Sequence, residues 1–376
     1  MRNKNHILKL VLIGIILLSL SMPLPAYGES FDVGYFLQIK NLIQKNYVYD
    51  IGEQELIEGA IKGLFYHLDE NSGYYTKEEF DGLLQDITGD FVGIGVYIGD
   101  KDGQIVIVDT IKNGPAHKAG MKAEDIILNI DGKDVKNLTL DEVIKLIQGK
   151  EGSKVNIMVE RGQEKKLKFT LNREKIKINP VDYKIIDKNI GYIRLNQFSQ
   201  NSCDEIVLAL KEFDKKNISN IIIDLRDNPG GLLDQAVNIS KLFIPEGPIV
   251  HIKFKGGKIT TYYSSLKKPK YNLSIIVNEN SASASEIFAG AVQDRKAGKI
   301  VGVTTYGKGT VQQLVSLPNG DGMKLTIAEY LTPNMRNINK KGIVPDIVVE
   351  NKGDKDLQLE KAIQSFKNWN IDVTQL

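Results

Sequence analysis

The chain has 376 residues, of which 42% are hydrophobic and 26% charged, a composition typical of folded proteins with room for two or three domains. Its 49 basic and 47 acidic residues leave a net charge of only +2, so neither a nucleic-acid-binding surface nor a polybasic membrane-binding patch is indicated. The single cysteine, Cys203, excludes an internal disulfide, and the four histidines lack metal-ligand spacing, so we expect no metal and no cofactor.

The first 28 residues have the pattern of a secretory signal. Arg2, Lys4 and Lys9 precede an apolar run over 10–20, and small residues follow at 26–28 with spacing suited to cleavage. The run is shorter than the ~20 residues of a membrane-spanning helix, and an uncleaved anchor is the alternative. With either interpretation, the sequence predicts export across the cytoplasmic membrane, so that the body is secreted or membrane-anchored.

Two segments of different character follow. Apolar residues recur with helical spacing over 31–85, which predicts a small helical N-terminal cap at residues 29–87. From 88 to 172 the chain changes to short apolar strands separated by glycine and aspartate, with one helix expected over 140–148. This second segment is expected to fold as a compact β-rich module.

Beyond residue 173, strands and helices alternate. Strands expected at 221–225 and 273–277 are each followed by a turn and a helical segment. This alternation predicts an α/β domain over 173–350, and residues 351–376 are expected to form a C-terminal helical segment. In such sheets, functional sites gather where strands end and helices begin.

Two of these junctions carry residues suited to acyl-transfer chemistry. The Asn-Pro-Gly-Gly turn at 228–231 can present unhindered backbone amides to a developing negative charge, or it is simply a tight strand-to-helix turn. At the second junction, Ser283 and Glu286 have the spacing of a helix capping box. The same position would place a serine hydroxyl beside free amides at a helix start, so a capping serine and a nucleophile are both open.

Lys308 lies in the glycine-rich stretch 302–310, which comes close to a phosphate-binding P-loop. Gly309 stands where that loop needs a hydroxyl for magnesium, and the segment that follows has the composition of a strand. No histidine flanks Ser283, so its base would be a lysine, and burial of Lys308 would favour the neutral amine. The alternative is an exposed loop lysine. A second Ser-x-x-Lys pattern, at 264–267, lacks the other motifs of a penicillin-binding site.

Four motifs resemble those of one family in their order and spacing. They are DLRDNPGGLL at 224–233, NENSASASEIFAGAVQDR at 278–295, GVTTYGKGTVQ at 302–312 and KGIVPDI at 341–347. Over about residues 32–350 the chain is similar to the carboxyl-terminal processing peptidases, also called tail-specific proteases. Residues 91–98 and 113–132 resemble the PDZ domain of that family, and residues 68–80 resemble the segment that precedes it.

The resemblance implies a serine endopeptidase with a Ser–Lys dyad. Its fold would be an α/β protease core of the crotonase or Clp-protease type, with an inserted β-rich PDZ domain and a helical N-terminal cap. In the family pattern the nucleophile is Ser283, the general base is Lys308, and Gln312 orients that lysine.

The resemblance also implies an oxyanion hole. Backbone amides of Gly230 or Gly231 and of Ala284 would form it. Asp227 departs from the family pattern, and it places a negative charge near this hole.

The PDZ resemblance implies that Gly93, Ile94, Gly95 and Val96 bind the C-terminal carboxylate of a protein or peptide substrate, whose tail adds as a strand. Substrates would have free, apolar C-termini, the enzyme would be a homodimer, and it could act in regulatory proteolysis. A different class is also open, a catalytically inactive scaffold that binds partner C-termini through the same groove. The intact serine, lysine and glutamine favour the enzyme.

Overall fold

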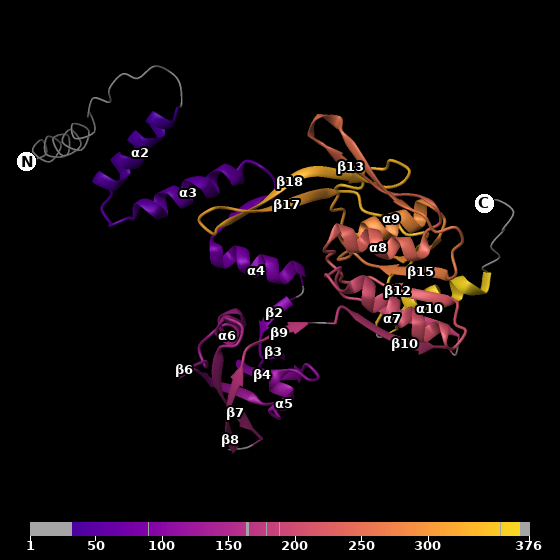
Figure 1. Ribbon diagram of the computed structural model, residues 1–376, viewed down its shortest axis with the longest axis horizontal. Helices are drawn as coiled ribbons and strands as arrows, with labels where there is room; N and C mark the ends of the chain where they lie inside the picture. The colour runs from indigo at the N-terminus through magenta and orange to yellow at the C-terminus, as the bar shows by residue number, and fades with distance from the viewer. Residues whose placement is uncertain are drawn as a thin grey trace, which may run out of the picture. The chain divides into compact units, whose positions relative to one another are not determined.

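A computed structural model describes residues 32–88, 90–162, 165–177, 179–187, 189–353 and 355–368 (Figure 1). The signal or anchor segment predicted at 1–28 lies outside these residues. The chain divides into two compact units, one that ends at Leu68 and one that begins at Asp69. Within the described residues, no helix is both long and apolar enough to cross a membrane.

The described part of the first unit contains two helices, α2 (Val33–Asn46) and α3 (Glu53–Tyr66). Glu53 and Glu55 occupy the first turn of α3, where acidic side chains stabilise the positive end of the helix dipole. Lys40 of α2 forms an ion pair with Glu53. Lys40 is the one buried residue of these two helices, so the apolar side chains that produce the helical spacing lie largely at the surface.

The strand β1 (Gly73–Tyr75) and the helix α4 (Lys77–Thr88) belong to the second unit. β1 pairs antiparallel with β18 (Gly322–Leu331), and Phe80 of α4 is buried. The cap expected at 29–87 therefore contains a strand and is divided between the two units. Helical periodicity cannot reveal this division, because it depends on pairing with a strand far along the chain.

Residues 90–177 form a β-rich module with its own core. Its elements are β2 (Asp90–Gly93), β3 (Val96–Lys101), β4 (Gln104–Thr110), α5 (Pro115–Lys118), β5 (Ile126–Ile130), β6 (Lys133–Asp134), α6 (Leu140–Ile147), β7 (Lys154–Arg161), β8 (Lys165–Asn172) and β9 (Glu174–Lys177). β2 and β9 pair antiparallel, so the chain enters and leaves the module side by side, as an insertion requires. Ile107, Val143 and Val155 are fully buried in its core, which is closed by α6, the helix expected from the sequence.

The α/β domain is built on a six-stranded sheet with the order β10-β11-β12-β15-β16-β19, in which only β10 and β11 pair antiparallel. Its strands are β10 (Val181–Ile186), β11 (Ile190–Leu195), β12 (Asn220–Asp224), β15 (Asn272–Val277), β16 (Gly298–Gly302) and β19 (Ile347–Val348). Its helices are α7 (Ser202–Asp214), α8 (Leu233–Phe243), α9 (Ala284–Asp294) and α10 (Leu357–Ser365). Ile221 and Ile223 face the core shared with α7, α8 and α9, whereas Ile222 lies in a cluster with Ala362 of α10. Both faces of the parallel strands are therefore covered, which explains their nearly continuous apolar sequences.

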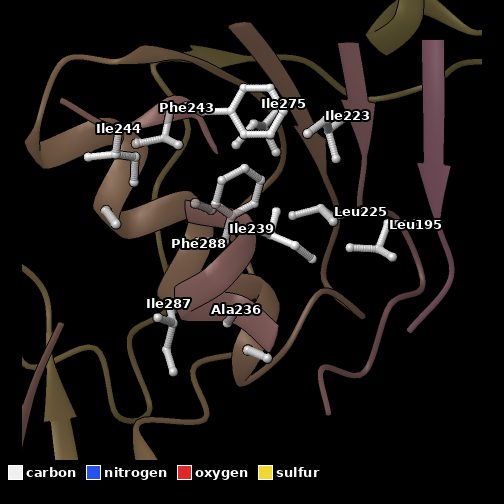
Figure 2. Close-up of a cluster of buried hydrophobic side chains, with 14 of the residues drawn as sticks. Leu195, Ile223, Leu225, Ala236, Ile239, Phe243, Ile244, Ile275, Ile287 and Phe288 are labelled. Carbon is white, nitrogen blue, oxygen red and sulfur yellow. The ribbon is translucent and has the colours of Figure 1, made fainter. Parts of the chain in front are cut away.

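A second sheet has the order β1-β18-β13-β14, and β17 also pairs with β18. Its remaining strands are β13 (Gly247–Phe254), β14 (Ile259–Ser264) and β17 (Thr310–Ser316). α8 and α9 share one buried core with both sheets. In this core Phe243 and Phe288 pack with ring centroids 6.0 Å apart, close to Ile275 (Figure 2).

The architecture confirms the predicted α/β core with an inserted β-rich module. The strand–turn–helix units β12–α8 and β15–α9 form where the sequence places them. The segment after Lys308 is strand β17, so the P-loop interpretation is excluded, since a P-loop must lead into a helix.

Candidate active site

Ser283 lies at the N-terminus of α9, directly after the turn that leaves β15. Its backbone has φ 54° and ψ −112°, a conformation that residues with a side chain rarely adopt. The Ser283 amide donates to the Glu286 carboxylate at 2.9 Å, which is the reciprocal half of the predicted capping box. A partly accessible serine on a strained strand-to-helix turn is an arrangement suited to a nucleophile.

The two neighbouring serines are fully buried and already bonded. Ser281 Oγ donates to the Leu225 carbonyl at 2.8 Å, and Ser285 Oγ donates to the Asn228 carbonyl at 3.0 Å. Both hydroxyls therefore hold this junction against the turn that follows β12. Ser283 is the serine of this string that solvent reaches.

The other candidate groups, Ser264 with Lys267 and His251, make hydrogen bonds or ion pairs of their own. Ser264 is buried and donates to a backbone carbonyl at 2.6 Å, while Lys267 forms an exposed ion pair with Glu246 at 2.6 Å. His251 lies in β13 with Nδ1 2.7 Å from Thr261 Oγ1. Among the described residues, no three histidine, cysteine or acidic side chains group as metal ligands.

The turn at 228–231 packs directly against Ser283. Asn228 is fully buried, its side chain donates to the last carbonyl of β11 at 2.7 Å, and its own carbonyl accepts from the Ala282 amide at 3.0 Å. Gly230 has φ 103°, and a Cβ there would lie 2.8 Å from Ser283 Cβ. Glycine is therefore required by both the backbone conformation and the close approach of the two junctions.

The three amides implied for the oxyanion hole differ in their hydrogen bonds. Gly230 N donates to Asn228 Oδ1 at 2.9 Å, so this amide is engaged within its own turn. Gly231 N and Ala284 N make no hydrogen bond among the described residues, and Ala284 begins α9, where amides lack intrahelical partners. Gly231 and Ala284 are therefore the available donors in this conformation, and Gly230 would first have to leave Asn228.

Lys308 lies between Gly307 and Gly309 in the loop that leads into β17. A Cβ at Gly307 would lie 2.9 Å from the Lys341 amide, and a Cβ at Gly309 would lie 2.7 Å from the Asn339 amide. Both glycines thus allow the loop to pack tightly against the neighbouring segment, which holds the lysine backbone in place.

The Lys308 amine is partly buried, and this burial lowers its pKa. The positive charge of Lys324 lowers the pKa further. Three carboxylates act in the opposite direction, those of Asp69, Glu286 and Glu70. The net effect lowers the pKa of Lys308, so at a given pH a larger fraction of this lysine is the neutral amine that can accept a proton than for an ordinary surface lysine.

The buried carboxylate of Glu286 connects the two candidate catalytic segments. It accepts from the amides of Ser283 and Lys308, each at 2.9 Å. It also accepts from Gly307 N at 2.7 Å and from Thr305 Oγ1 at 2.6 Å. Burial raises the pKa of Glu286, and these four donors oppose that shift.

The hydroxyl of Tyr330 makes a second connection. Tyr330 lies in β18, and its single hydroxyl hydrogen is shared between the Ser283 carbonyl, 3.1 Å away, and the Lys308 carbonyl. The backbones on both sides of the site are therefore held together through amides by Glu286 and through carbonyls by Tyr330.

Gln312 lies on β17, and two threonines hold its side-chain amide. Nε2 donates to Thr310 Oγ1 at 2.9 Å and to Thr326 Oγ1 at 3.1 Å. Among the described residues, no hydrogen bond joins the Lys308 amine to Ser283 Oγ or to Gln312 Oε1. Such bonds are often long in a substrate-free site and shorten when substrate binds.

Asp227 does not leave an unpaired charge beside the turn at 228–231. Its carboxylate accepts from Asn280 Nδ2 at 2.9 Å and from Asn278 Nδ2 at 2.8 Å. These bonds and the Arg194 guanidinium, 3.5 Å away, lower the pKa of Asp227. The negative charge is therefore stable and compensated where it lies.

The β-rich module contains a groove of its own, with a volume of about 250 Å³. The loop residues singled out from the sequence, Gly93, Ile94, Gly95 and Val96, line it together with Ile144 of α6. Its walls are mainly aliphatic, so it suits an apolar side chain better than a charged one.

Sequence reasoning missed the part that Tyr330 plays and recognised only one of the two roles of Glu286. The capping box signals the bond from Glu286 to Ser283, but the bonds to the lysine loop require the folded chain. Tyr330 lies 47 residues from Ser283, and no local pattern marks it.

Comparison with known proteins places these features in a family. Residues 189–349 match the model of peptidase family S41, and residues 106–161 match that of the PDZ domain. A probable CtpA-like serine protease of Staphylococcus aureus (strain N315) is 37% identical over 340 residues, which are 89% of this chain and 68% of that protein. A protein of the same description from Staphylococcus haemolyticus is 42% identical over 298 residues, 78% of this chain and 60% of the relative.

Solved structures support the same family and fold. A photosystem II D1 C-terminal processing protease is 28% identical with a TM-score of 0.50, covering 84% of this chain and 92% of that one. A putative S41 protease from Bacteroides fragilis is only 15% identical, yet it covers 92% of this chain and 99% of its own with a TM-score of 0.54, which supports the fold alone.

Proposed function

The chain belongs to peptidase family S41, and from that premise we propose that it is an exported endopeptidase with a Ser283–Lys308 dyad that selects substrates by their C-terminal tails. That it is a serine-type peptidase with a PDZ domain follows from the family. The observation that carries the dyad is the shared anchoring of both residues, since Glu286 accepts from the Ser283 and Lys308 amides at 2.9 Å.

In the proposed reaction, neutral Lys308 removes the Ser283 proton as the oxygen attacks the scissile carbonyl. The amides of Gly231 and Ala284 stabilise the oxyanion. When the C–N bond breaks, the lysine ammonium returns its proton to the leaving amine, and an ester on Ser283 remains. Lys308 then activates the water that hydrolyses this ester and regenerates the serine. Gln312 Oε1 accepts from the lysine amine and keeps its lone pair directed at the serine.

The PDZ groove supports selection of free, apolar C-termini. We expect the wild-type enzyme to cleave an unfolded protein with a free apolar tail about tenfold faster than its amidated or Asp-terminated forms. Amidation removes the carboxylate that the loop amides would bind, and a charge-assisted hydrogen bond contributes about 1.5–3 kcal/mol. Comparison of kcat/KM for the three substrates measures this preference.

A groove variant and a matched control sharpen that test. Ile144→Asp puts a charge into the groove, and Lys145→Asp introduces the same residue one position along on an exposed site. Only Ile144→Asp should abolish the preference. Equal cleavage of free and amidated tails by the wild type would contradict reading of C-termini by this module.

The sequence pattern of residues 1–28 supports export of the protein in a secreted or membrane-anchored form, where it would act in processing or regulatory proteolysis. Fractionation of the producing cells, with N-terminal sequencing of the mature protein, tests this localisation. Protein found only in the cytoplasm with an intact N-terminus would contradict it.

The exposed helices α2 and α3 support a homodimer. Val33, Phe36 and Leu37 of α2 and Leu64 and Tyr66 of α3 are apolar or aromatic and exposed, and a helix pair without a buried apolar core needs a partner surface. In light scattering, Phe36→Asp with Leu37→Asp is expected to give a monomer, while Gln54→Asp on an exposed site of α3 leaves the dimer intact. A monomeric wild type would contradict the proposal.

A further inference from the structure

We propose that Thr326 and Asp69 are positioning residues that determine the orientation of the Gln312 side-chain amide. In this orientation the amide oxygen, rather than the nitrogen, faces the Lys308 amine. The inference rests on the proposed function, because it concerns the orientation of the proposed base. Thr326 lies outside the family motifs, and Asp69 lies in the segment 68–80 but not in the motifs that contain Ser283, Lys308 and Gln312.

The side-chain amide of Gln312 is hydrogen-bonded through its nitrogen. Its nitrogen donates to two hydroxyl oxygens, Thr310 Oγ1 at 2.9 Å and Thr326 Oγ1 at 3.1 Å. Hydroxyl groups both donate and accept, so two hydroxyls alone would tolerate the opposite orientation of the amide. Something else has to determine its direction.

Thr326 makes a further hydrogen bond, to the carboxylate of Asp69. Thr326 Oγ1 donates to Asp69 Oδ1 at 3.1 Å, and an ionised carboxylate can only accept. The hydroxyl hydrogen of Thr326 is therefore used, and this oxygen can only accept from Gln312. The polarity of the glutamine amide is thus set by a carboxylate that lies 257 residues before Thr326 in the chain.

The turn that carries Asp69 is itself held in place. The Asn71 amide donates to Asp69 Oδ1 at 2.8 Å, and Ser72 Oγ donates to Asp69 Oδ2 at 3.2 Å. The Thr326 amide donates to Ser72 Oγ at 3.0 Å. Backbone and side chain of Thr326 are therefore both bonded to this one turn, which makes it a defined part of the site rather than a loose connection.

The same turn also affects the charge of the base. Asp69 and Glu70 raise the pKa of Lys308, as does Glu286 from α9, while burial and Lys324 of β18 lower it. Loss of the Asp69 charge should therefore lower the pKa of Lys308 further. Asp69→Asn then has two separable effects, one on the orientation of the amide and one on the pH at which the lysine becomes neutral.

The test compares Thr326→Val, Thr326→Ser and Asp69→Asn in the full-length enzyme, using kcat and KM on an unfolded protein with an apolar tail across pH. Thr326→Val removes the hydroxyl at similar size and should lower kcat about tenfold or more with KM unchanged, because a well-placed base contributes about 10²–10⁴-fold. Thr326→Ser keeps the hydroxyl and should retain most of the activity. Asp69→Asn should lower the plateau and shift the acid limb of the pH profile to lower pH.

Two controls separate positioning from general damage. Thr260→Val makes the same chemical change at an exposed position of β14 and should leave kcat unchanged. In a Gln312→Ala background, Thr326→Val should cause no further loss, because a residue that acts through Gln312 has nothing left to position.

The outcomes distinguish this inference from the proposed function. Full activity of Thr326→Val, or equal losses in Thr326→Val and Thr326→Ser, would overturn the positioning role while Ser283→Ala remains inactive. An additive loss in the Gln312→Ala background would also overturn it. An active Ser283→Ala enzyme would instead reject the dyad itself. If Thr326→Val fails to fold, the Thr326→Ser and Asp69→Asn profiles decide the question.

Discussion

Ser283→Ala is expected to abolish proteolysis, with kcat lower by about 10⁶-fold, the order found when the serine of a catalytic triad is removed. Without the hydroxyl no acyl-enzyme ester can form, and the available amides of Gly231 and Ala284 have no tetrahedral intermediate to stabilise. Fold stability should change little, because Ser283 is partly accessible and the backbone amides of residues 283 and 308 still donate to the Glu286 carboxylate. Cleavage of an unfolded apolar-tailed protein measures the effect.

Labelling by a serine-reactive phosphonate probe, located by mass spectrometry, provides the direct assignment. The label should appear on Ser283 and be absent from Ser281 and Ser285, whose hydroxyls are buried and bonded. Ser219→Ala, at an exposed position, is the matched control and should remain active. A label on Ser281 or Ser285, or cleavage by Ser283→Ala at the wild-type rate, would reject the assignment. If the wild type binds apolar tails but cleaves none, the protein is a scaffold.

Lys308→Arg is expected to be as inactive as Lys308→Ala, because a guanidinium stays protonated and cannot accept the serine proton. The loss in kcat should approach that of Ser283→Ala, since the two residues act as a unit. Lys267→Arg, at the exposed lysine of the Ser-x-x-Lys pattern, is the matched control and should keep full activity. Substantial activity in Lys308→Arg would exclude lysine as the base.

The pH dependence of the wild type follows from the direction of the lysine shift. Burial and then Lys324 lower the pKa of Lys308 in the folded enzyme, so activity should rise with pH and reach its plateau below the range of an ordinary lysine. The unfolded chain binds more protons at this site than the folded one between the two pKa values. The contribution of Lys308 to stability therefore becomes more favourable as pH rises through that window.

Replacing Lys308 by a neutral residue tests, through the stability of the fold, whether burial lowers the pKa of the lysine. Lys308→Met should be inactive but no less stable than the wild type at neutral pH, because it removes the cost of a partly buried ammonium. Thermal unfolding and cleavage measured on one preparation give both results. A large loss of stability would mean that the ammonium is needed for folding and that its pKa is not depressed.

Much of the architecture could be predicted because its signals are local. The β12–α8 and β15–α9 junctions are marked by apolar runs, by the Asn-Pro-Gly-Gly turn and by the capping box of Ser283 and Glu286, all within a few residues. The family motifs carried Ser283, Lys308 and Gln312 together, although nothing local joins them. The helical periodicity of the cap did not reveal β1, because β1 becomes a strand only through pairing with β18.

By itself, the sequence determined most strand and helix segments and the β-rich module, because short-range periodicity and turn chemistry are properties of neighbouring residues. The serine and lysine expected to react came from the family motifs that the sequence contains. Only the tertiary structure decided that Glu286 and Tyr330 bond to the segments of both Ser283 and Lys308, that Gly230 donates to Asn228, and that Thr326 bonds to both Asp69 and the Gln312 amide. These depend on hydrogen bonds whose donors and acceptors are brought together by the packing of distant segments. Burial has the same origin, and the pKa of Lys308 is lowered chiefly by the folded chain around it.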